Sequence, residues 1–488
     1  MPEAPVIIAG AGPNGLMLAC ELALAGVRAV VVDRLPAPSE EPKANGLVGQ
    51  VVRQLDMRGL YARIAESSSA PKPVAAWMFS GVPVPLAEVA DNPVYAQLIA
   101  QPELVRLLYA RARELGAEVR WGHEVVGFED RGDGIVTTVA APEGVYAFSS
   151  QYLVGADGGR SAVRKLAGID FPGHTADTVA RIGHVRVPEQ WRTGSGGLDV
   201  PGFGRVEFGH TRLDRGGIVY AEFEPGRPML GTIEFGSGAA GSASDKNPMT
   251  VGELRDSVSR VLGVDLPIEE PADGGPQALR RIAGQNTRQA TRYRAGRVLL
   301  LGDSAHVHSA MGGPGLNLGL QDAMNLGWKL AAAATGQASS GLLDTYESER
   351  YPVGRRVMMH SMSQTALFSP GPEIGALREL FTELMSVPGV AGHIGALLAG
   401  SDVRYDVGDD HPLSGYLVPD FTLADGRRVA ELLHDARPVI VRDVVEGPAA
   451  MLLRPDGYVA WAADDLAKPG LDEAVSRWFS SASRVYRP

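Results

Sequence analysis

A glycine-rich turn between a short apolar strand and an apolar helix constrains this chain more than any other feature. The segment comprises a predicted strand, a turn, a helix and a second strand, at residues 6–9, 10–15, 16–26 and 28–33. The second strand ends in an acid, and GxGxxG followed at this distance by an acid is the fingerprint of a dinucleotide-binding unit. A glycine turn alone is common before helices. Here the strand, the helix and the acid all agree, which favours a dinucleotide site.

Each position of this fingerprint has its own physical role. Gly10 permits the tight turn, Gly12 lets the backbone approach a pyrophosphate, and Gly15 lets the helix pack closely on the sheet. The start of the helix presents unpaired N–H groups to the phosphates. Asp33 stands where a carboxylate accepts hydrogen bonds from both hydroxyls of an adenosine ribose. NAD and FAD share the fingerprint, so the rest of the chain must distinguish them.

Composition narrows the class of protein. The 488 residues leave room for two or three domains, and a formal net charge of -11 argues against nucleic acid or anionic membrane as a partner. Cys20 is the only cysteine, which excludes an internal disulfide, a cysteine-based zinc site and CxxC redox chemistry. The histidines contain no HExxH, so we expect no metal site. The N-terminus lacks a signal-peptide pattern, and we expect a cytoplasmic enzyme.

The strand-to-glycine pattern returns twice further along the chain. A strand at residues 152–155 leads into ADGGRSAVR at residues 156–164, and a buried strand at 296–301 leads into Gly302-Asp303. Between them, alternation predicts a second, mostly antiparallel sheet. Helices are expected at about residues 47–60, 104–115, 251–262, 316–335, 342–368 and 471–478, and further short strands at 119–121, 125–129, 135–140, 146–149, 439–441, 450–453 and 458–461.

With these motifs read, the chain resembles the FAD-dependent aromatic hydroxylases, the single-component flavoprotein monooxygenases of the p-hydroxybenzoate hydroxylase type. The resemblance rests on residues 10–16, 156–164 and 302–306, which look like the family's three FAD motifs in the family's order. Further stretches look like the subgroup that hydroxylates aromatic polyketides in antibiotic biosynthesis, namely residues 152–155, 327–330, 343–347 and 453–457.

The resemblance implies an α/β fold in three parts. A Rossmann-type FAD-binding domain would comprise residues 1–172 and 281–400. A mostly antiparallel substrate sheet would be inserted at 173–280, with strands from about 74–98. Residues 401–488 would form a thioredoxin-like region, which looks shortened because only about ten residues separate two of its predicted strands.

The implied activity is that of an FAD monooxygenase. NADPH or NADH would reduce FAD, dioxygen would add to give a C4a-hydroperoxyflavin, and its distal oxygen would pass to a polycyclic aromatic substrate of polyketide type. We expect a monomer or homodimer. Baeyer-Villiger or epoxidising oxygenation and an antibiotic-inactivating hydroxylation stay open as alternatives. A plain NAD-dependent dehydrogenase leaves the second and third motifs unexplained, a non-catalytic flavin-binding module would oxidise no NAD(P)H, and a halogenase is disfavoured because the chain has no WxW.

The residues and the resemblance together give a set of cofactor-binding positions: Gly10, Gly12, Pro13, Asn14, Gly15, Asp33, Arg34, Lys43, Gln101, Val125, Asp157, Asp303, Pro314, Gly315, Leu316 and Asn317. In the family, the acid matched by Asp157 lies near the pyrophosphate and the nicotinamide path, and the acid matched by Asp303 holds the ribityl chain. The alternatives are a helix cap for Asp157, a turn residue for Asp303 and a surface position for Gln101.

Three positions depart from the family pattern. Lys43 replaces an arginine near the FAD, so a point charge takes the place of a bidentate fork. Ala310 stands where a proline usually borders the flavin, and Pro314 replaces a glutamine or lysine in the turn beneath it.

Four aromatic residues are candidates to line a pocket for flat rings: Trp77, Phe79, Tyr220 and Phe223. Core packing explains each of them equally well. His306 and His308 favour a structural role over a catalytic one, and no residue stands out as a general base, so the catalytic residue stays unknown.

Overall fold

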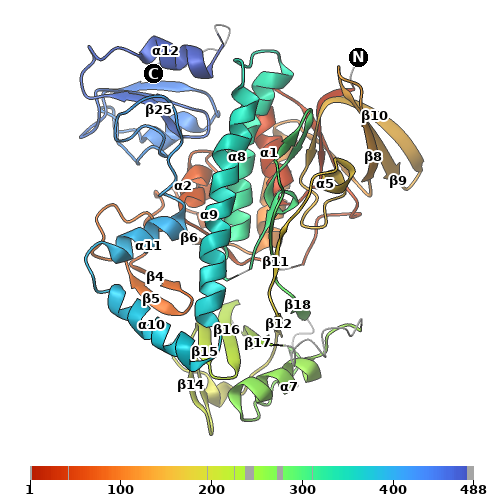
Figure 1. Cartoon of the computed structure of the whole chain (residues 1–488), viewed down its shortest axis with the longest axis vertical. Coiled ribbons are helices and arrows are strands. Elements are labelled where there is room, and N and C mark those ends of the chain that lie inside the picture. Colours follow the sequence, from red (N-terminus) through yellow and green to blue (C-terminus); the bar gives the residue numbers. More distant parts are fainter. Residues whose placement is uncertain are drawn as a thin grey trace.

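The structure is a computed structural model that describes residues 3–41, 43–194, 196–224, 226–236, 247–271, 278–309 and 311–480, without the side chains of 223 and 224. It contains a large parallel-sheet domain, a five-stranded antiparallel sheet at one end of it, and a C-terminal region packed against its side (Figure 1). Helix α9 (Thr345–Phe368) runs from the C-terminal region to the antiparallel sheet, so it contacts all three parts.

The parallel sheet forms the centre of the large domain. Its parallel strands lie in the order β21-β10-β1-β2-β7, with bounds Val298–Leu300, Gly144–Gly155, Ala4–Ala9, Ala29–Asp33 and Glu118–Trp121. The antiparallel strands β20 (Arg294–Ala295), β8 (Glu124–Asp130) and β9 (Ile135–Ala141) complete it. The strands expected at 146–149 and 152–155 are one continuous strand, β10, which pairs with β9 near its start and with β1 and β21 near its end.

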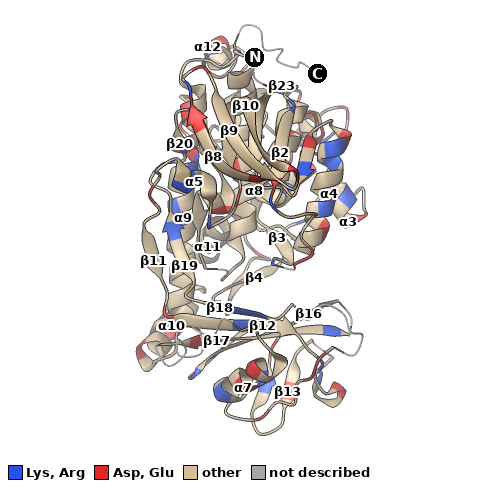
Figure 2. Cartoon of the chain, turned by 90° about the vertical axis from the view of Figure 1, so that its right-hand side faces the viewer, with Lys and Arg blue, Asp and Glu red and all other residues tan. Residues whose placement is uncertain are grey.

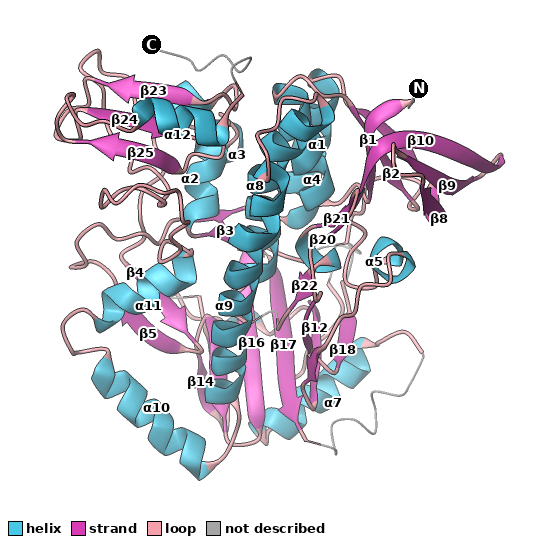
Figure 3. Cartoon of the chain, turned by 45° about the horizontal axis from the view of Figure 1, so that its top comes forward, coloured by secondary structure: helices cyan, strands magenta, loops and turns pink. Residues whose placement is uncertain are grey.

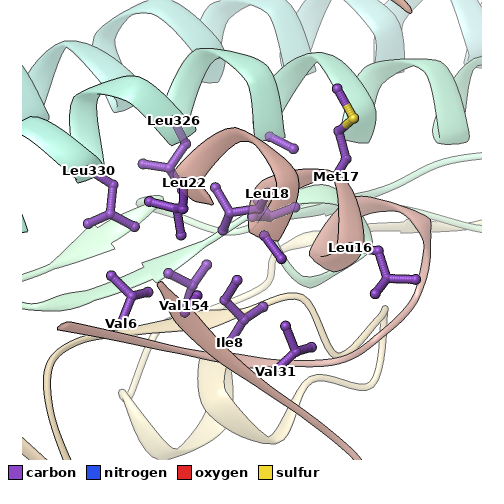
Figure 4. Packing of buried hydrophobic residues seen from close by; sticks show 14 of the residues in the cluster. Val6, Ile8, Leu16, Met17, Leu18, Leu22, Val31, Val154, Leu326 and Leu330 are labelled. Atoms are coloured by element: carbon purple, nitrogen blue, oxygen red, sulfur yellow. The ribbon is translucent and has the colours of Figure 1, made fainter. Parts of the chain in front are cut away.

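Helix α1 (Pro13–Leu24) lies between this sheet and α8 (Pro314–Ala334), as Figure 4 shows. Leu18 and Leu22 of α1 face Leu326 of α8 on one side and the strand residue Ile8 on the other, and all are fully buried. Burying a leucine side chain contributes roughly 1.5 to 3 kcal/mol, so this layer holds the start of α1 firmly against the sheet. Helix α4 (Gln101–Glu114) packs on the same side of the sheet.

The five-stranded sheet has order β15-β16-β17-β12-β18, with bounds Gly209–Leu213, Gly216–Glu224, Arg227–Phe235, Thr178–His184 and Arg280–Ala283. All of its pairs are antiparallel, as expected. Helix α7 (Val251–Leu262), whose bounds match the sequence prediction, covers the outer face (Figure 2). The opposite face therefore turns toward the large domain.

The segment between residues 46 and 98 differs from the expectation. Strands β4 (Ala76–Phe79) and β5 (Val82–Pro85) pair only with each other among the described strands and do not join the five-stranded sheet. They pack instead with α10 (Pro372–Leu384) and α11 (Val390–Ala399). The helix expected at 47–60 is present as the shorter α2 (Gln50–Asp56). It is preceded by β3 (Gly46–Val48), which pairs with β6 (Ala96–Leu98), and followed by the short helix α3 (Tyr61–Ala65). Local periodicity did not reveal these long-range pairings.

Smaller elements connect the main ones. They are α5 (Ala162–Leu166), the three-stranded sheet of β11 (Gly173–Thr175), β19 (Asn286–Gln289) and β22 (His306–Val307), the hairpin of β13 (Leu198–Val200) and β14 (Gly204–Val206), and the 3-10 turns η1 (Glu189–Trp191), η2 (Gly302–Ser304), η3 (Leu342–Asp344) and η4 (Val429–Leu433).

The C-terminal region, residues 401–488, contains a small antiparallel sheet and one α-helix among its described residues. Its antiparallel strands are β23 (Val439–Arg442), β24 (Ala450–Leu453) and β25 (Val459–Ala463), followed by α12 (Leu471–Trp478) (Figure 3). Trp478 and Phe479 contact Trp328 of α8, with ring centroids 6.3 and 5.8 Å apart. The region therefore shares a hydrophobic core with the large domain.

Within the part of the chain that the structure describes, no helix combines the length and apolar character needed to cross a membrane.

Candidate cofactor and substrate site

Four neighbouring parallel strands deliver the three motifs and Asp33 to one edge of the sheet. In register, Ala9 of β1 pairs with Gly155 of β10, and Gly155 pairs with Leu300 of β21. The GxGxxG turn, the 156–164 motif and the 302–306 motif follow these three positions directly. Ligands of open parallel sheets bind at the carboxyl ends of the strands. Segments about 150 residues apart in sequence, by the numbering of the registers, thus form one site.

The three glycines of the first turn differ in what a side chain would meet. A Cβ on Gly10 would lie 2.3 Å from the carbonyl oxygen of Ala156, and one on Gly15 would lie 2.0 Å from that of Gly10. Both positions therefore require glycine for close packing of the turn. A Cβ on Gly12 would meet no atom of the described residues within 4 Å. The open space beside Gly12 is where a pyrophosphate would approach the backbone.

The start of α1 is free to bind an anion. Its N-cap is Gly12, followed by Pro13, and among the described residues no side chain caps the helix and no acid lies in its first turn. Its N–H groups therefore keep their attraction for phosphate. The Asp33 carboxylate accepts hydrogen bonds from the backbone N–H of Ala11 at 2.7 Å and of Leu35 at 2.8 Å, which fixes it beside the turn. Arg34 next to it is exposed.

Asp157 caps a helix, which was the alternative interpretation of this residue. One carboxylate oxygen accepts from the backbone N–H groups of Ala162 and Val163, at 2.7 and 3.1 Å. The other accepts from the Ser304 hydroxyl at 3.0 Å, and that hydroxyl accepts from the Gly158 N–H at 3.1 Å. Asp157 thus ties the second motif to the third, and its contact with a cofactor stays a prediction.

Arg164 has a bracing role that the sequence did not suggest. Its guanidinium donates to the carbonyl oxygens of Ser304 and Gly159, at 2.8 and 3.0 Å, and lies 3.7 Å from the centroid of the Phe171 ring. Arg164 thus joins the second motif to the third, as Asp157 does.

Asp303 lies in the 3-10 turn η2, which packs against α8. Its side chain is accessible, yet the surrounding protein raises its pKa by burial, against the lowering effects of His306 and Lys43. Lys43 is exposed and pairs with Glu41 at 3.2 Å. The Asp303 carboxylate is therefore open to a ligand.

The start of α8 offers a second open helix end. Its N-cap is Gly313 in the left-handed region (φ 65°), followed by Pro314, and again no described side chain caps it. Gly315 packs against His308, because a Cβ on Gly315 would lie 3.2 Å from the imidazole. Burial lowers the pKa of His308 to about 4, so this imidazole is neutral at pH 7. A neutral ring leaves the positive end of α8 as the local attraction for negative charge.

Asn317 and Asn14 hold neighbouring segments together. Asn317 donates to the Gly313 carbonyl at 3.0 Å and accepts from the Val48 N–H at 3.1 Å, which joins β3 to the start of α8. The Asn14 side chain fits between two glycines of other elements, since a Cβ on Gly302 or Gly319 would lie 2.2 Å from its amide nitrogen. The Asn14 Oδ1 is buried and has no partner among the described residues.

The remaining predicted contacts are placed as follows. Gln101 is half-buried at the start of α4, and its N–H donates to the Ala44 carbonyl at 2.8 Å. Val125 is buried in β8 and Leu316 is half-buried in the first turn of α8. Ala310 lies outside the described residues. Two open helix starts, an open glycine and the accessible Asp303 carboxylate together fit an elongated, anionic dinucleotide such as FAD.

The face of the five-stranded sheet opposite α7, which turns toward the large domain, is largely apolar. Ile233, Phe235 and Ala180 pack there with Met311 and with Phe368 at the end of α9. This agrees with a wide apolar wall above the cofactor. Arg280 is a polar exception on this face, because it pairs with Ile182 in register and its Nε is buried without a partner among the described residues.

Two predicted substrate contacts are corrected. Tyr220 is buried in the cluster beneath α7, on the outer face of the sheet, and Phe79 is buried against Phe381 with ring centroids 5.3 Å apart. Both therefore serve core packing. Trp77 is half-buried against the cluster that holds Phe79, and the Phe223 side chain lies outside the described residues.

Sequence reasoning missed the residue that holds the third motif in place. Asp322 on α8 is fully buried and accepts from the Gly302 N–H at 3.2 Å and from His306 Nε2 at 2.6 Å. A charged residue within the apolar run of α8 was the available signal, since an unpaired charge is rarely buried.

Comparison with known proteins agrees with this geometry. A family model described as FAD binding domain matches residues 3–200 and 239–361, more than half of the chain. A second, described as aromatic-ring hydroxylase, C-terminal, matches residues 440–482.

Individual relatives match nearly the whole chain. It is 39% identical to a 12-dehydrotetracycline 5-monooxygenase/anhydrotetracycline 6-monooxygenase of Streptomyces rimosus, over 97% of this chain and 98% of that protein. It is 35% identical to a rifampicin monooxygenase of Streptomyces venezuelae, over 98% of this chain and 99% of that protein. Among solved structures, the OxyS anhydrotetracycline hydroxylase from Streptomyces rimosus matches with a TM-score of 0.85 and 37% identity, over 98% and 99% of the two chains.

Proposed function

The chain belongs to the family of FAD-dependent aromatic hydroxylases and is an FAD-dependent monooxygenase, and on this premise we propose that it uses NADPH or NADH to hydroxylate a polycyclic aromatic substrate of polyketide type. The observation that carries the proposal is the convergence of three motifs at the carboxyl ends of β1, β10 and β21, beside an apolar sheet face. A dehydrogenase needs only the first of these motifs.

The cofactor roles follow from the groups at this edge. The open start of α1 and the backbone at Gly12 would hold the pyrophosphate, with Asp33 toward the ribose. Asp303 would accept hydrogen bonds from the ribityl hydroxyls, and the open start of α8 would stabilise negative charge on the flavin ring. When bound, FAD would supply the hydride and dioxygen chemistry.

The protein's own contribution is positioning and exclusion of water. The described cluster at this face consists of apolar residues and offers no general base. A phenolic substrate needs little such help, because it already donates electrons to the ring carbon that is attacked. Rate control therefore rests on holding the polycycle over the flavin. The half-buried apolar residues Ala180 and Phe235 of this face would do this by contact area.

We infer the substrate class from the apolar sheet face and from the similarity to named relatives. The relative with 39% identity is named for oxidising tetracycline precursors, which favours a polycyclic substrate here. The similarity to a rifampicin monooxygenase favours, as the second candidate, hydroxylation that inactivates an antibiotic. Baeyer-Villiger or epoxidising oxygenation on the same scaffold is a further alternative, which product NMR distinguishes from ring hydroxylation.

The organisation proposed for the chain keeps the division made from sequence. Residues 1–172 and 281–400 form the FAD domain, 173–280 the substrate domain and 401–488 the C-terminal region. The hairpin of β4 and β5 is assigned to neither sheet, because it packs with α10 and α11. We propose a cytoplasmic monomer or homodimer.

The test begins with the absorbance spectrum of the purified protein. We expect flavin bands from noncovalent FAD, and oxidation of NADPH or NADH that accelerates when a polycyclic phenol is added. Mass spectrometry should then show the gain of one oxygen atom. A protein that takes up no FAD on titration contradicts the proposal as a whole, whereas a flavoprotein that oxidises NAD(P)H without oxygenating any polycycle contradicts the substrate assignment alone.

A further inference from the structure

The buried carboxylate of Asp322 binds both ends of the turn that carries Asp303. Asp322 Oδ2 accepts from the backbone N–H of Gly302, one residue before Asp303, and contacts Nε2 of His306, three residues after it. The turn starts with Gly302 at φ 57°, in the left-handed region, and a Cβ there would collide with Asn14. Asp322 thus helps to fix the turn that carries Asp303.

Arg350 of α9 binds the other carboxylate oxygen of Asp322. Arg350 Nε donates to Asp322 Oδ1 at 2.6 Å, and its Nη2 donates to the Leu318 carbonyl at 3.2 Å. Burial acts to raise the pKa of Asp322, but Arg350 and His306 outweigh it and keep that pKa below its usual value. Asp322 is therefore a carboxylate at neutral pH, able to accept from several donors at once.

Tyr405 of the C-terminal region in turn binds Arg350. Its Nη1 donates to the Tyr405 hydroxyl at 3.0 Å. The Tyr405 ring is buried and stacks on Tyr458, with centroids 4.3 Å apart and ring planes 29° apart. Direct hydrogen bonds thus connect Tyr405, Arg350, Asp322 and the backbone of Gly302. The first three residues are at most 5% exposed.

We propose that the C-terminal region is a positioning element of the cofactor site, in which Tyr405 acts through Arg350 and Asp322 to hold Asp303 where it binds FAD. The proposal rests on the proposed function, since it takes Asp303 as an FAD contact. Losing the Tyr405 hydroxyl leaves one N–H of a buried guanidinium without its acceptor, and Arg350 then shifts toward other partners. Asp322 and the Gly302 turn follow, because they share the same hydrogen bonds.

A neighbouring buried network provides a matched control. Lys329 of α8 donates to Asn325 at 2.8 Å and to Glu349 at 2.7 Å, and is fully buried. It lies on the same helix as Asp322, and its partner Glu349 also binds Arg454 of the C-terminal region. No hydrogen bond between described residues joins Lys329 to the Gly302 turn, so the variant loosens the C-terminal region without cutting the Tyr405–Arg350–Asp322 connection. A general loosening of α8 against α9 affects both networks. Only the network through Asp322 reaches Asp303.

The experiment compares Tyr405→Phe with Lys329→Met in the full-length protein. FAD affinity is measured by titrating apoprotein under conditions where urea denaturation shows it to be folded. We expect Tyr405→Phe to raise the FAD dissociation constant about tenfold and to alter the visible circular dichroism of bound flavin. Lys329→Met should lower the urea midpoint while leaving the dissociation constant within about twofold. Asp322→Asn should raise the constant further than Tyr405→Phe.

Three outcomes would overturn the proposal, and they are distinguishable. If Asp303→Ala weakens FAD binding but Tyr405→Phe leaves both the dissociation constant and the flavin dichroism unchanged, the site is correct and the positioning role is wrong. If neither Asp303→Ala nor Tyr405→Phe affects FAD, the placement of the cofactor at Asp303 fails together with the inference. A fall in affinity of the same size in Lys329→Met also refutes it, because the effect would then be general loosening.

Discussion

Arg454 of the C-terminal region donates two parallel hydrogen bonds to the Glu349 carboxylate of α9, at 2.6 and 2.8 Å, in a buried pair. Asp456 accepts from the same guanidinium, and Lys329 donates to the same carboxylate. Although burial acts to raise the pKa of Glu349, Arg454 and Lys329 lower it to about 2. The C-terminal region is therefore anchored to the large domain by charge as well as by its apolar core.

Breaking this anchor should destabilise the protein. Removing one partner of a buried ion pair leaves an uncompensated charge and costs about 3 to 5 kcal/mol. We expect Arg454→Met to lower the free energy of unfolding by about that amount in urea denaturation. The exposed pair of Arg106 and Glu40, 2.7 Å apart, supplies the control, and Arg106→Met should cost less than about 1 kcal/mol. Equal losses in the two variants would contradict the anchoring role.

Gly12 and Gly15 should respond oppositely to alanine. At Gly12, with φ -73° and no described atom within 4 Å of an added Cβ, alanine should leave the apoprotein stable but obstruct the pyrophosphate, lowering FAD affinity at least about tenfold. At Gly15 the new Cβ would lie 2.0 Å from a backbone oxygen, so the fold itself should lose stability. Thermal melting and FAD titration of both apoproteins separate the two effects. Unchanged FAD affinity in Gly12→Ala would contradict the pyrophosphate site.

Asp303→Ala should lose FAD while keeping the fold. The side chain makes no hydrogen bond to the described residues, so its removal disturbs little of the protein itself. Hydrogen bonds to a charged group contribute roughly 1.5 to 3 kcal/mol each, which corresponds to about a 10- to 100-fold loss of affinity per bond. Asp303→Asn retains an acceptor and should lose less. Flavin content after purification and FAD titration provide the measurement, and wild-type affinity in Asp303→Ala would refute the ribityl assignment.

His360 should make stability fall in mild acid. Burial and, to a smaller extent, Arg356 lower its pKa from 6.5 to about 4. The unfolded chain therefore takes up a proton at higher pH than the folded one, so this stability is present above pH 6.5 and is lost as the pH falls toward 4. The loss amounts to about 3 kcal/mol. His360→Gln should flatten the pH dependence of urea unfolding over this range. A slope identical to that of the wild type would contradict the assignment.

Substrate size should govern coupling. The apolar sheet face that carries the half-buried Ala180 and Phe235 gains contact with a polycycle that a single ring cannot match. We expect NAD(P)H oxidation and product yield to rise markedly with polycyclic phenols and little with single-ring phenols. Stopped assays that compare NAD(P)H consumed with product formed measure the coupling. Single-ring phenols that couple as well as polycycles would refute the size argument and leave the monooxygenase assignment intact.

The sequence by itself determined the elements whose causes are local. The first strand, glycine turn, helix and Asp33 lie within about 30 contiguous residues by their numbering, and the structure has them where the pattern predicts. Helices α7 and α12 have the bounds expected from periodicity. Local spacing suffices there, because amphipathic period and turn residues act over one or two helical turns.

Only the tertiary structure decided what each side chain faces. From the sequence, Phe79 and Tyr220 could equally line a pocket or pack in the core. The elements that pack on their strands bury both side chains in the core. Asp157 became a cap linked to Ser304 almost 150 residues away. Asp322 reaches Gly302 because α8 packs against the strand ends. A strand alternates its faces whatever covers them, and a buried charge finds its partner through contacts between distant segments, so these outcomes depend on packing that no local pattern encodes.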